Sequence, residues 1–372
     1  MQTRTKEIII GIIILIVVFV AGYFLYPKLN KSQVPVNTVD NTIIDDTPIA
    51  QRDLKPETKE PVALTPKIEK ENIPVEPPLP EGTDRFIVGI TNTNDGIAEN
   101  LLQTGYIANK DSLLALLNKE KVPVVAGAYK ISKVMTPEQI NKVLHSKPYM
   151  KWVVIKEGLR KEEIATLLAN SLGWTSTQKK NWIEKDTATS PEYTEGVYYP
   201  DTYLIPVAED TALVAKRLIT KFNENFASYL PQFTAKNIKW ARALTLASIV
   251  QREASSDSDM PLIAGILWNR LNNDMALGVD ATLQYIRGDV GKGWWAPITV
   301  AEKQTDSPFN TYKYKGLPPH PISNPGVPAI SAVLNPTKTD CLYYLHDKSR
   351  VTHCAPTYEE HKLNIQKYLI AQ

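Results

Sequence analysis

The 372-residue chain is poor in cysteine, with only Cys341 and Cys354. Two cysteines exclude a disulfide-dense scaffold and a multi-cysteine zinc or iron–sulfur site. Net charge is also small, at +2 from 42 basic and 40 acidic residues, so composition points to no nucleic-acid partner. The histidines form no H-E-x-x-H pair, and neither a Walker-type phosphate loop nor a G-x-S-x-G motif occurs. We therefore expect no metal and no cofactor.

A long uncharged stretch near the N-terminus predicts a membrane anchor. Residues 8–26 carry no charge, and as a helix they would extend roughly 28 Å, about one bilayer core. The run exceeds the ~7–15 apolar residues of a signal peptide, and no A-x-A-like site follows, so an anchor is favoured over a cleaved leader. Two basic residues stand on each side, so charge does not set the orientation. Because so little precedes the run, we expect residues 1–7 in the cytoplasm and the bulk outside, in a single-pass protein of the cell (inner) membrane.

The following segment lacks the residues that a folded core needs. Nine of the 27 prolines lie in residues 32–83, where no aromatic residue occurs. Little apolar area is available there to offset the conformational entropy of the chain. We therefore expect residues 27–83 to form a disordered Pro-rich tether, with a fully extended length of at most roughly 160 Å.

Folded sequence is expected from residue 84 onward. The segment "FIVGI" at 86–90 predicts a strand, and the apolar spacing over 97–102 predicts a helix after a turn. The same order returns with a strand at 152–156 and a helix over 164–168. Such α+β units are similar to the LysM peptidoglycan-binding fold, whose core begins with a strand followed by a helix.

One predicted helix carries a candidate acid at its end. Residues 238–255 have helical character, and Leu246, Ile249 and Val250 precede Glu253 by spacings that place all four on one face. A carboxyl group at the end of an apolar stripe is expected to be partly buried, which raises its pKa. A protonated carboxylic acid near neutral pH is what cleavage of a glycosidic bond requires. The alternative is an ordinary solvated glutamate at a helix end.

Several motifs narrow the choice because they occur together. They are "EGVYYPDTY" (195–203), "LASIVQREAS" (246–255), "NRL" (269–271), "DATLQY" (280–285), "SPFNTY" (307–312) and "GLPPHPISNPG" (316–326). This ordered series resembles the MltG (YceG-like) family of endolytic murein transglycosylases over residues 84–372. The resemblance implies a LysM-like subdomain at 84–150 and a mixed α+β catalytic domain at 151–372.

The resemblance also implies a reaction and its partners. Glu253 corresponds to the family's catalytic acid, while Gln251 replaces the glutamate that commonly precedes it in the pattern Glu-Lys-Glu or Glu-Arg-Glu. The expected activity is lytic cleavage of nascent peptidoglycan glycan strands with formation of a 1,6-anhydro end, coupled to cell-wall synthases. Two alternatives stay open: a membrane-tethered peptidoglycan-binding protein without catalysis, and a hydrolytic muramidase.

Other motif residues are candidates for substrate contact through hydrogen bonds to sugar hydroxyl and N-acetyl groups. They are Asp280, Thr282, Asn310, Tyr312 and Asn324. The alternative is that Asn and Thr in Pro/Gly-rich loops bind their own backbone. Glu195 is expected to be structural.

The two cysteines flank a predicted hairpin. "CLYYLH" at 341–346 and "VTHC" at 351–354 form two strands around the turn "DKSR". Pairing about that turn sets residue 345 opposite 350 and residue 341 opposite 354, close enough for a disulfide in a non-hydrogen-bonded pair. We hypothesise this disulfide; two free core thiols are the alternative.

Overall fold

The computed structural model describes residues 78–188 and 194–371. The predicted span at 8–26 and nearly all of the predicted tether lie outside these ranges. Within them, no helix combines the length and apolar character needed to cross a membrane. The described residues mix helices and strands, which confirms the expected α+β class.

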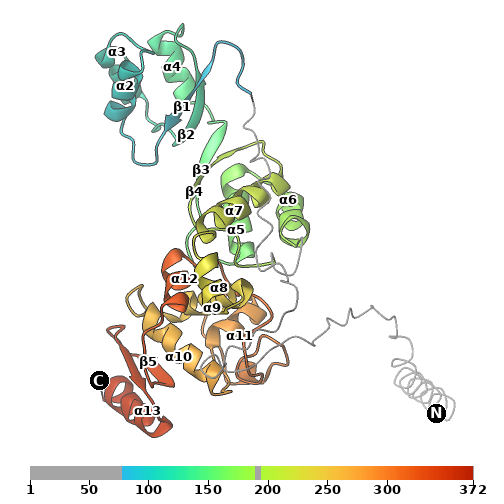
Figure 1. The fold of residues 1–372 in the computed structure, drawn as a ribbon. Helices are drawn as coiled ribbons and strands as arrows, with labels where there is room; N and C mark the ends of the chain where they lie inside the picture. The colour runs from blue at the N-terminus through green and yellow to red at the C-terminus, as the bar shows by residue number, and fades with distance from the viewer. Residues whose placement is uncertain (1–77, 189–193, 372) are drawn as a thin grey trace, which may run out of the picture. The chain divides into compact units, whose positions relative to one another are not determined.

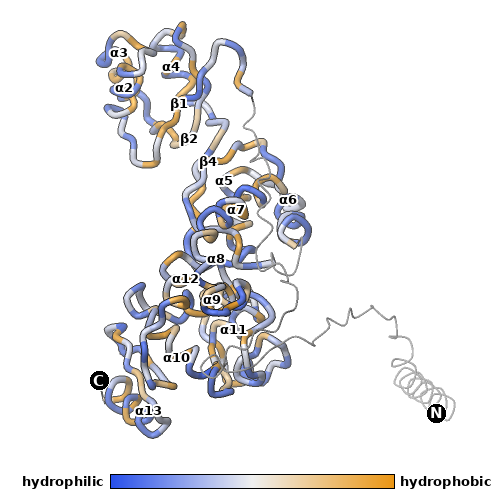
Figure 2. The backbone as a smooth tube through the Cα atoms, viewed as in Figure 1, coloured by the Kyte–Doolittle hydropathy of each residue, from blue (hydrophilic) through white to orange (hydrophobic). Residues whose placement is uncertain are grey.

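The first folded unit has the order β-α-α-β-α (Figure 1). Its elements are β1 (Asp84–Val88), α2 (Asn94–Gln103), α3 (Lys110–Lys119), β2 (Gly127–Ile131) and α4 (Pro137–Leu144). β1 and β2 are antiparallel, with Phe86 opposite Tyr129. Both side chains belong to a buried cluster shared with α2, α3 and α4. The tube through these helices alternates between apolar and polar colouring in Figure 2, as expected of helices with one buried face.

β1 begins and ends two residues before the predicted strand. The chain turns at Gly89, because the Asn92 side-chain oxygen accepts a hydrogen bond from the Gly89 N–H and the Asn92 N–H bonds back to the Gly89 carbonyl. An asparagine that binds the backbone three residues away in this manner ends a strand.

A second unit repeats the order of the first. Its elements are β3 (Met150–Val154), α5 (Lys161–Leu172), α6 (Ser176–Asn181), the π-helical η2 (Trp182–Asp186), β4 (Thr202–Pro206) and α7 (Thr211–Phe226). β3 and β4 are antiparallel, and β3 also pairs with β2, so the four strands form one sheet in the order β1-β2-β3-β4. A Cβ atom on Gly127 would lie 2.4 Å from the Met150 carbonyl oxygen, so glycine permits the close approach of β2 and β3.

The third part is mainly helical. Its elements are α8 (Leu230–Ala235), α9 (Trp240–Glu253), α10 (Met260–Asn272), α11 (Asp280–Arg287), the 3₁₀ helix η4 (Ala301–Gln304) and α12 (Val327–Leu334). α9 packs against α10, α11 and α12. Its side chains join a large buried cluster that also includes residues of the second unit. The helix predicted at 238–255 is therefore the central helix of this core.

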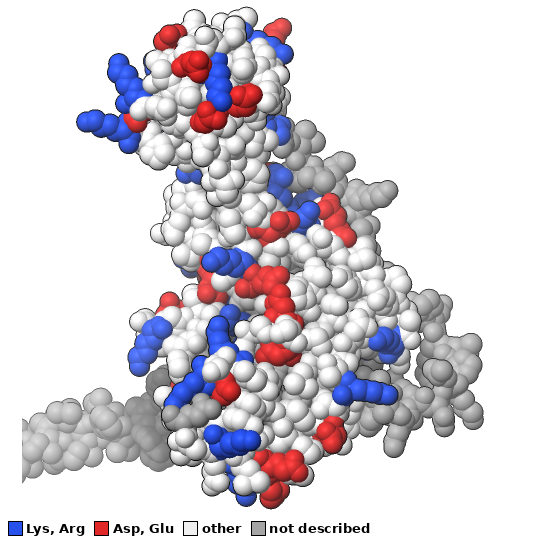
Figure 3. All heavy atoms as spheres, turned by 90° about the vertical axis from the view of Figure 1, so that its left-hand side faces the viewer, with Lys and Arg blue, Asp and Glu red and all other residues white. Residues whose placement is uncertain are grey.

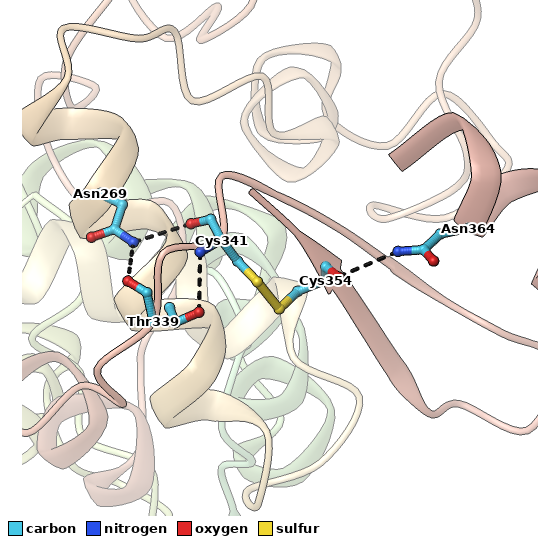
Figure 4. Close-up of a disulfide and its surroundings, with 5 residues drawn as sticks. All are labelled: Asn269, Thr339, Cys341, Cys354 and Asn364. Atoms are coloured by element: carbon cyan, nitrogen blue, oxygen red, sulfur yellow. Dashed lines mark hydrogen bonds between the residues drawn. A yellow bond between two sulfur atoms is a disulfide. The ribbon is translucent and has the colours of Figure 1, made fainter. Parts of the chain in front are cut away.

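The chain closes with a hairpin and a helix. The elements are β5 (Tyr343–His346), β6 (Thr352–Ala355), α13 (Tyr358–Ile365) and the π-helical η5 (Gln366–Ile370). The predicted disulfide is confirmed: Cys341 and Cys354 are bonded, with their Cα atoms 5.8 Å apart (Figure 4).

The predicted register of this hairpin is wrong. Residue 345 pairs with residue 353, and Cys354 lies opposite Tyr344. The turn is longer than expected because the Asp347 side chain accepts hydrogen bonds from the N–H groups of residues 349 and 351, and Arg350 has a positive φ of 67°. Residues 348–350 thus form a three-residue loop that ends in a left-handed residue, and this loop shifts the strand pairing from the predicted register. Cys341 consequently lies just before β5.

Basic and acidic side chains intermingle on the face drawn in Figure 3. On that face several acidic side chains gather near the middle, while the basic side chains of the described residues are scattered and form no continuous stripe. The picture agrees with the nearly balanced charge of the whole chain.

Candidate active site

Glu253 is the last residue of α9, at the end of an apolar face. Leu246, Ile249 and Val250 on that face are fully buried. The helix ends because Ala254 turns to an extended conformation, with φ −68° and ψ 141°. The carboxyl group therefore lies where the buried core ends, and the Glu253 side chain is only partly exposed.

The surroundings of Glu253 shift its acidity. Burial raises the pKa of Glu253, and the negative charge of Asp280 raises it further. The Tyr344 hydroxyl donates a 2.6 Å hydrogen bond to Glu253 Oε2 and lowers this pKa, as do His346 and the Ala281 N–H to a smaller degree. The net pKa shift is upward, which favours the proton-donating form near neutral pH.

Asp280 and Tyr312 lie beside this carboxyl group. The Tyr312 hydroxyl donates a hydrogen bond to Asp280 Oδ1, and Lys303 Nζ is 3.9 Å from the same oxygen. The Lys303 amine also stands 4.3 Å from the centre of the Tyr312 ring. The Asp280 side chain is 49% exposed. Of the predicted substrate-contact residues, these two have side chains that reach the surface next to Glu253.

Thr282 and Asn310 are buried and bonded internally. The Thr282 hydroxyl donates to the Val279 carbonyl at 2.8 Å and contacts the Thr311 hydroxyl at 3.0 Å. The Asn310 amide donates to the carbonyls of residues 303 and 305, while its oxygen accepts from the Tyr312 N–H. Their polar groups hold loops in shape, and direct substrate contact by these two residues stays a prediction.

Asn324 is likewise fully buried and joins distant segments. Its amide donates to the Leu159 carbonyl and to Glu195 Oε1, both at 2.9 Å, and its side-chain oxygen accepts from the Tyr198 N–H at 2.7 Å. Glu195 also accepts from the Lys161 N–H, at the start of α5. Burial raises the pKa of Glu195 to about 8, with Glu162 adding to the shift. Through these bonds Asn324 joins the loop 323–326 to the second unit, and its predicted contact with sugar stays a prediction.

The Gln251 side chain forms its hydrogen bonds with residues other than Glu253. Its side-chain oxygen accepts from the Gly326 N–H at 2.9 Å, and its side chain hydrogen-bonds Glu157. A Cβ atom on Gly326 would lie only 1.8 Å from Glu157 Oε1, so this glycine is needed for the contact. Burial, with the charge of Asp257, raises the pKa of Glu157. A second carboxyl group at position 251 would therefore face Glu157.

Aromatic side chains that the sequence motifs did not single out pack against Arg252 and Arg160. The Arg252 guanidinium lies 3.9 Å from the centre of the Trp295 ring, and the Trp295 Nε1 donates to Glu163 Oε2 at 2.9 Å. The Arg160 guanidinium lies between the Tyr285 ring at 4.2 Å and the Trp294 ring at 4.6 Å. Adjacent tryptophans in a glycine-rich loop were the available signal in the sequence.

Two further groups on β5 were also missed. Tyr344 contacts Glu253 directly, and His346 Nε2 lies 3.1 Å from Asp259 Oδ2. No spacing in the sequence indicates that a strand 91 residues beyond Glu253 reaches its side chain. Among the described residues, no group of three His, Cys, Asp or Glu side chains is arranged to hold a metal ion.

Comparison with known proteins identifies relatives over most of the chain. A family model described as the YceG-like family matches residues 87–367. A protein of Streptococcus pneumoniae strain D39 named endolytic murein transglycosylase is 26% identical over 325 residues, which cover 78% of this chain and 58% of that protein. This chain therefore spans little more than half the length of that relative.

A shorter relative and a solved structure agree with this match. The Bacillus subtilis strain 168 protein named endolytic murein transglycosylase is 29% identical over 269 residues, covering 66% of this chain and 73% of the relative. The crystal structure of a YceG-like protein from Listeria monocytogenes is similar with a TM-score of 0.55 and 25% identity, covering 76% of this chain and 99% of that one.

Proposed function

Because the chain belongs to the YceG-like family, we propose that it is a lytic transglycosylase that cuts nascent peptidoglycan glycan strands endolytically. The bond cleaved joins N-acetylmuramic acid to N-acetylglucosamine. The names of the pneumococcal and Bacillus relatives support this activity. The observation that carries the proposal is the Glu253 carboxyl group, which lies at the end of a buried helix face with its pKa raised by burial.

In the first step Glu253 acts as a general acid. Its carboxyl group donates a proton to the glycosidic oxygen, and the bond to the muramoyl anomeric carbon breaks. Positive charge develops at that carbon, where the N-acetyl group of the substrate can shield it, as in substrate-assisted hydrolases. The leaving N-acetylglucosamine keeps the donated proton as its new hydroxyl.

In the second step the same group acts as a base. The Glu253 carboxylate takes the proton from the muramic 6-hydroxyl, and that oxygen bonds to the anomeric carbon. The product is a 1,6-anhydro ring, no water is consumed, and Glu253 returns to its protonated form. One carboxyl group therefore suffices, in contrast to the pair that most glycosidases use.

Asp280 gives a specific reason to keep a second candidate. It is close enough to raise the pKa of Glu253, so the site contains two neighbouring carboxyl groups, as a hydrolytic muramidase requires. However, Tyr312 donates a hydrogen bond to Asp280 and Lys303 lies 3.9 Å away. These partners suit an orienting group better than a free nucleophile or base.

Product mass distinguishes the candidates in one digest. The protein is incubated with uncrosslinked peptidoglycan, and the soluble muropeptides are measured by mass spectrometry. Anhydro ends support the transglycosylase, and reducing ends support the muramidase. The absence of any product, with retention of the protein on the glycan, supports the non-catalytic binding alternative.

The proposal includes glycan binding by a LysM-like subdomain at 84–150, with residues 151–372 as the catalytic domain. The order β1-α2-α3-β2 with antiparallel strands supports the assignment of residues 84–150. The test is co-sedimentation of the Glu253→Gln variant with insoluble peptidoglycan. A variant that stays in the supernatant counts against the assignment.

The proposal also places the protein in the cell membrane. Residues 8–26 would span the bilayer with residues 1–7 in the cytoplasm, and residues 27–83 would serve as a tether for the folded part outside. The disulfide supports an oxidising location for that part. Resistance to alkaline extraction from membranes and digestion by external protease test the topology. Coupling to cell-wall synthases is tested by co-purification after crosslinking.

A further inference from the structure

The C-terminal hairpin supplies a group to the active carboxyl from a distant part of the chain. Tyr344 lies in β5, opposite Cys354 of β6, and its hydroxyl donates to Glu253 Oε2 at 2.6 Å. Cys354 is bonded in turn to Cys341, three residues before Tyr344. The residue that contacts Glu253 therefore stands inside a covalently closed loop.

Side chains of α10 hold the same strand in place. The Asn269 amide donates to the carbonyls of Thr339 and Cys341, at 2.8 and 3.1 Å (Figure 4). The Arg270 Nε donates to the Leu342 carbonyl at 2.6 Å. These bonds fix the backbone before Tyr344, because they bind the carbonyl groups of residues 339, 341 and 342.

A second set of contacts fixes the strand on the other side of Tyr344. Asp259, next to the start of α10, accepts hydrogen bonds from the Thr352 hydroxyl at 2.7 Å and from the N–H groups of residues 255 and 256. His346 Nε2 lies 3.1 Å from the same carboxylate. These partners lower the pKa of Asp259 to about 2 against the effect of burial, so it stays ionised. The hairpin is thus tied both to α10 and to the loop that follows Glu253.

We propose that Tyr344 is a positioning residue of the proposed reaction, which orients the Glu253 carboxyl group so that its transferable proton is carried by Oε1. When the tyrosine hydroxyl donates to Oε2, that carboxyl oxygen serves as a hydrogen-bond acceptor. The acid proton is then favoured on the other oxygen, and rotation of the carboxyl group is restricted. The disulfide-closed hairpin keeps the tyrosine at that distance. This inference rests on the proposed function for the reaction that Glu253 performs; the orientation of its carboxyl group by Tyr344 does not depend on that reaction.

The charged and titratable groups that face Glu253 come from several elements. They are Arg252 on α9, Asp280 on α11, Tyr312 in the loop before α12, and Tyr344 and His346 on β5. Arg270 on α10 acts on Tyr344. Among them, Tyr344 is the largest influence that lowers the pKa of Glu253. Removal of its hydroxyl should therefore raise this pKa while releasing the carboxyl group to rotate.

The test compares Tyr344→Phe with Tyr343→Phe. Neighbouring residues of a strand point to opposite faces, and the Tyr343 ring stacks on His361 with the ring centres 5.5 Å apart. Each variant loses one hydroxyl from the same strand. We expect Tyr344→Phe to lower kcat by roughly 10- to 100-fold, the range for loss of a hydrogen bond to a charged group. The basic limb of its kcat/KM profile should move to higher pH, while Tyr343→Phe keeps the wild-type rate and profile.

A purely structural role for Tyr344 would not move the pH profile in this direction. A Tyr344→Phe protein with wild-type rate and profile, or an equal loss in both variants, overturns the proposal. The double serine variant of the two cysteines is a second test, since it loosens the hairpin without touching Tyr344. We expect an intermediate loss of rate; wild-type activity in a fully reduced or double serine protein overturns the part assigned to the disulfide.

A titration without turnover separates this inference from the proposed function. Glutamate labelled with ¹³C in the carboxyl group allows the Glu253 signal to be followed by NMR, with Glu253→Gln used for assignment. We expect the signal to titrate at higher pH in Tyr344→Phe than in the wild-type protein. If the wild-type protein releases no glycan product, the proposed function fails, yet this comparison still decides the inference. Identical titration curves overturn it.

Discussion

Replacement of Glu253 by glutamine tests the assignment of the central carboxyl group. The amide keeps the shape of the protonated acid but cannot transfer a proton. A positioned general acid or base contributes about 10²–10⁴-fold to a rate. Because Glu253 is proposed to fill both roles in turn, the loss in kcat should be at least of this size. The Tyr344 hydroxyl, which donates to Glu253 Oε2, can donate equally to the glutamine oxygen.

The same substitution should leave the fold intact. Burial raises the pKa of Glu253 above its value in the unfolded chain. As the pH rises through the interval between these two values, the unfolded chain releases the proton while the native protein retains it, so wild-type stability falls. Glutamine carries no such proton. We therefore expect Glu253→Gln to unfold at a temperature equal to or above that of the wild-type protein in neutral buffer.

The assay is digestion of uncrosslinked peptidoglycan, with anhydromuropeptides quantified by mass spectrometry. Glu224→Gln is the matched control, because its side chain is 53% exposed on α7 and lies outside all the site motifs. The control should give wild-type amounts of product. Near-wild-type product from a folded Glu253→Gln protein would refute the assignment, and loss of the thermal transition would refute the stability argument.

Three further changes have defined outcomes. Asp280→Asn should lower kcat by about tenfold, which is less than the loss expected for Glu253→Gln. It should also move the basic limb of the pH–rate profile to lower pH, because the Asp280 charge raises the pKa of Glu253. A shift of that limb to higher pH contradicts this prediction. Gln251→Glu should lower the free energy of unfolding by about 1 kcal/mol, because the new carboxylate faces Glu157. The loss should be smaller in mildly acidic buffer, and equal stability of this variant in acidic and alkaline buffer contradicts the prediction. Serine at both cysteine positions should cost about 3 kcal/mol in chemical denaturation, and two free thiols in unreduced wild-type protein would contradict the bond.

Local periodicity was enough to predict the helix that carries Glu253. The spacing of Leu246, Ile249 and Val250 depends on neighbours within two turns, and all three are buried in the structure. The first and third strands were also predicted, each displaced by two residues. Their ends depend on turn contacts such as that between Gly89 and Asn92, which hydrophobic patterning does not encode.

The position of a residue in a motif did not reveal whether its side chain faces the substrate or the protein interior. Thr282, Asn310 and Asn324 all lie in motif segments, yet each is fully buried. A buried polar group must find partners, and the nearest were carbonyl and N–H groups of their own and adjoining loops. Asp280 lies two residues from Thr282 on α11 and is half exposed, a difference that arises from which face of that helix packs inward.

The sequence by itself determined the α+β class and the central helix with Glu253 at its end, and it suggested the Cys341–Cys354 disulfide without excluding two free thiols. Only the tertiary structure decided the hairpin register, the burial of the asparagine and threonine candidates, and the contact of Tyr344 with Glu253. The physical reason is distance along the chain. Secondary structure and a short disulfide loop depend on residues close in sequence, whereas the Tyr344 contact spans 91 residues and requires α9, α10 and the hairpin to pack first.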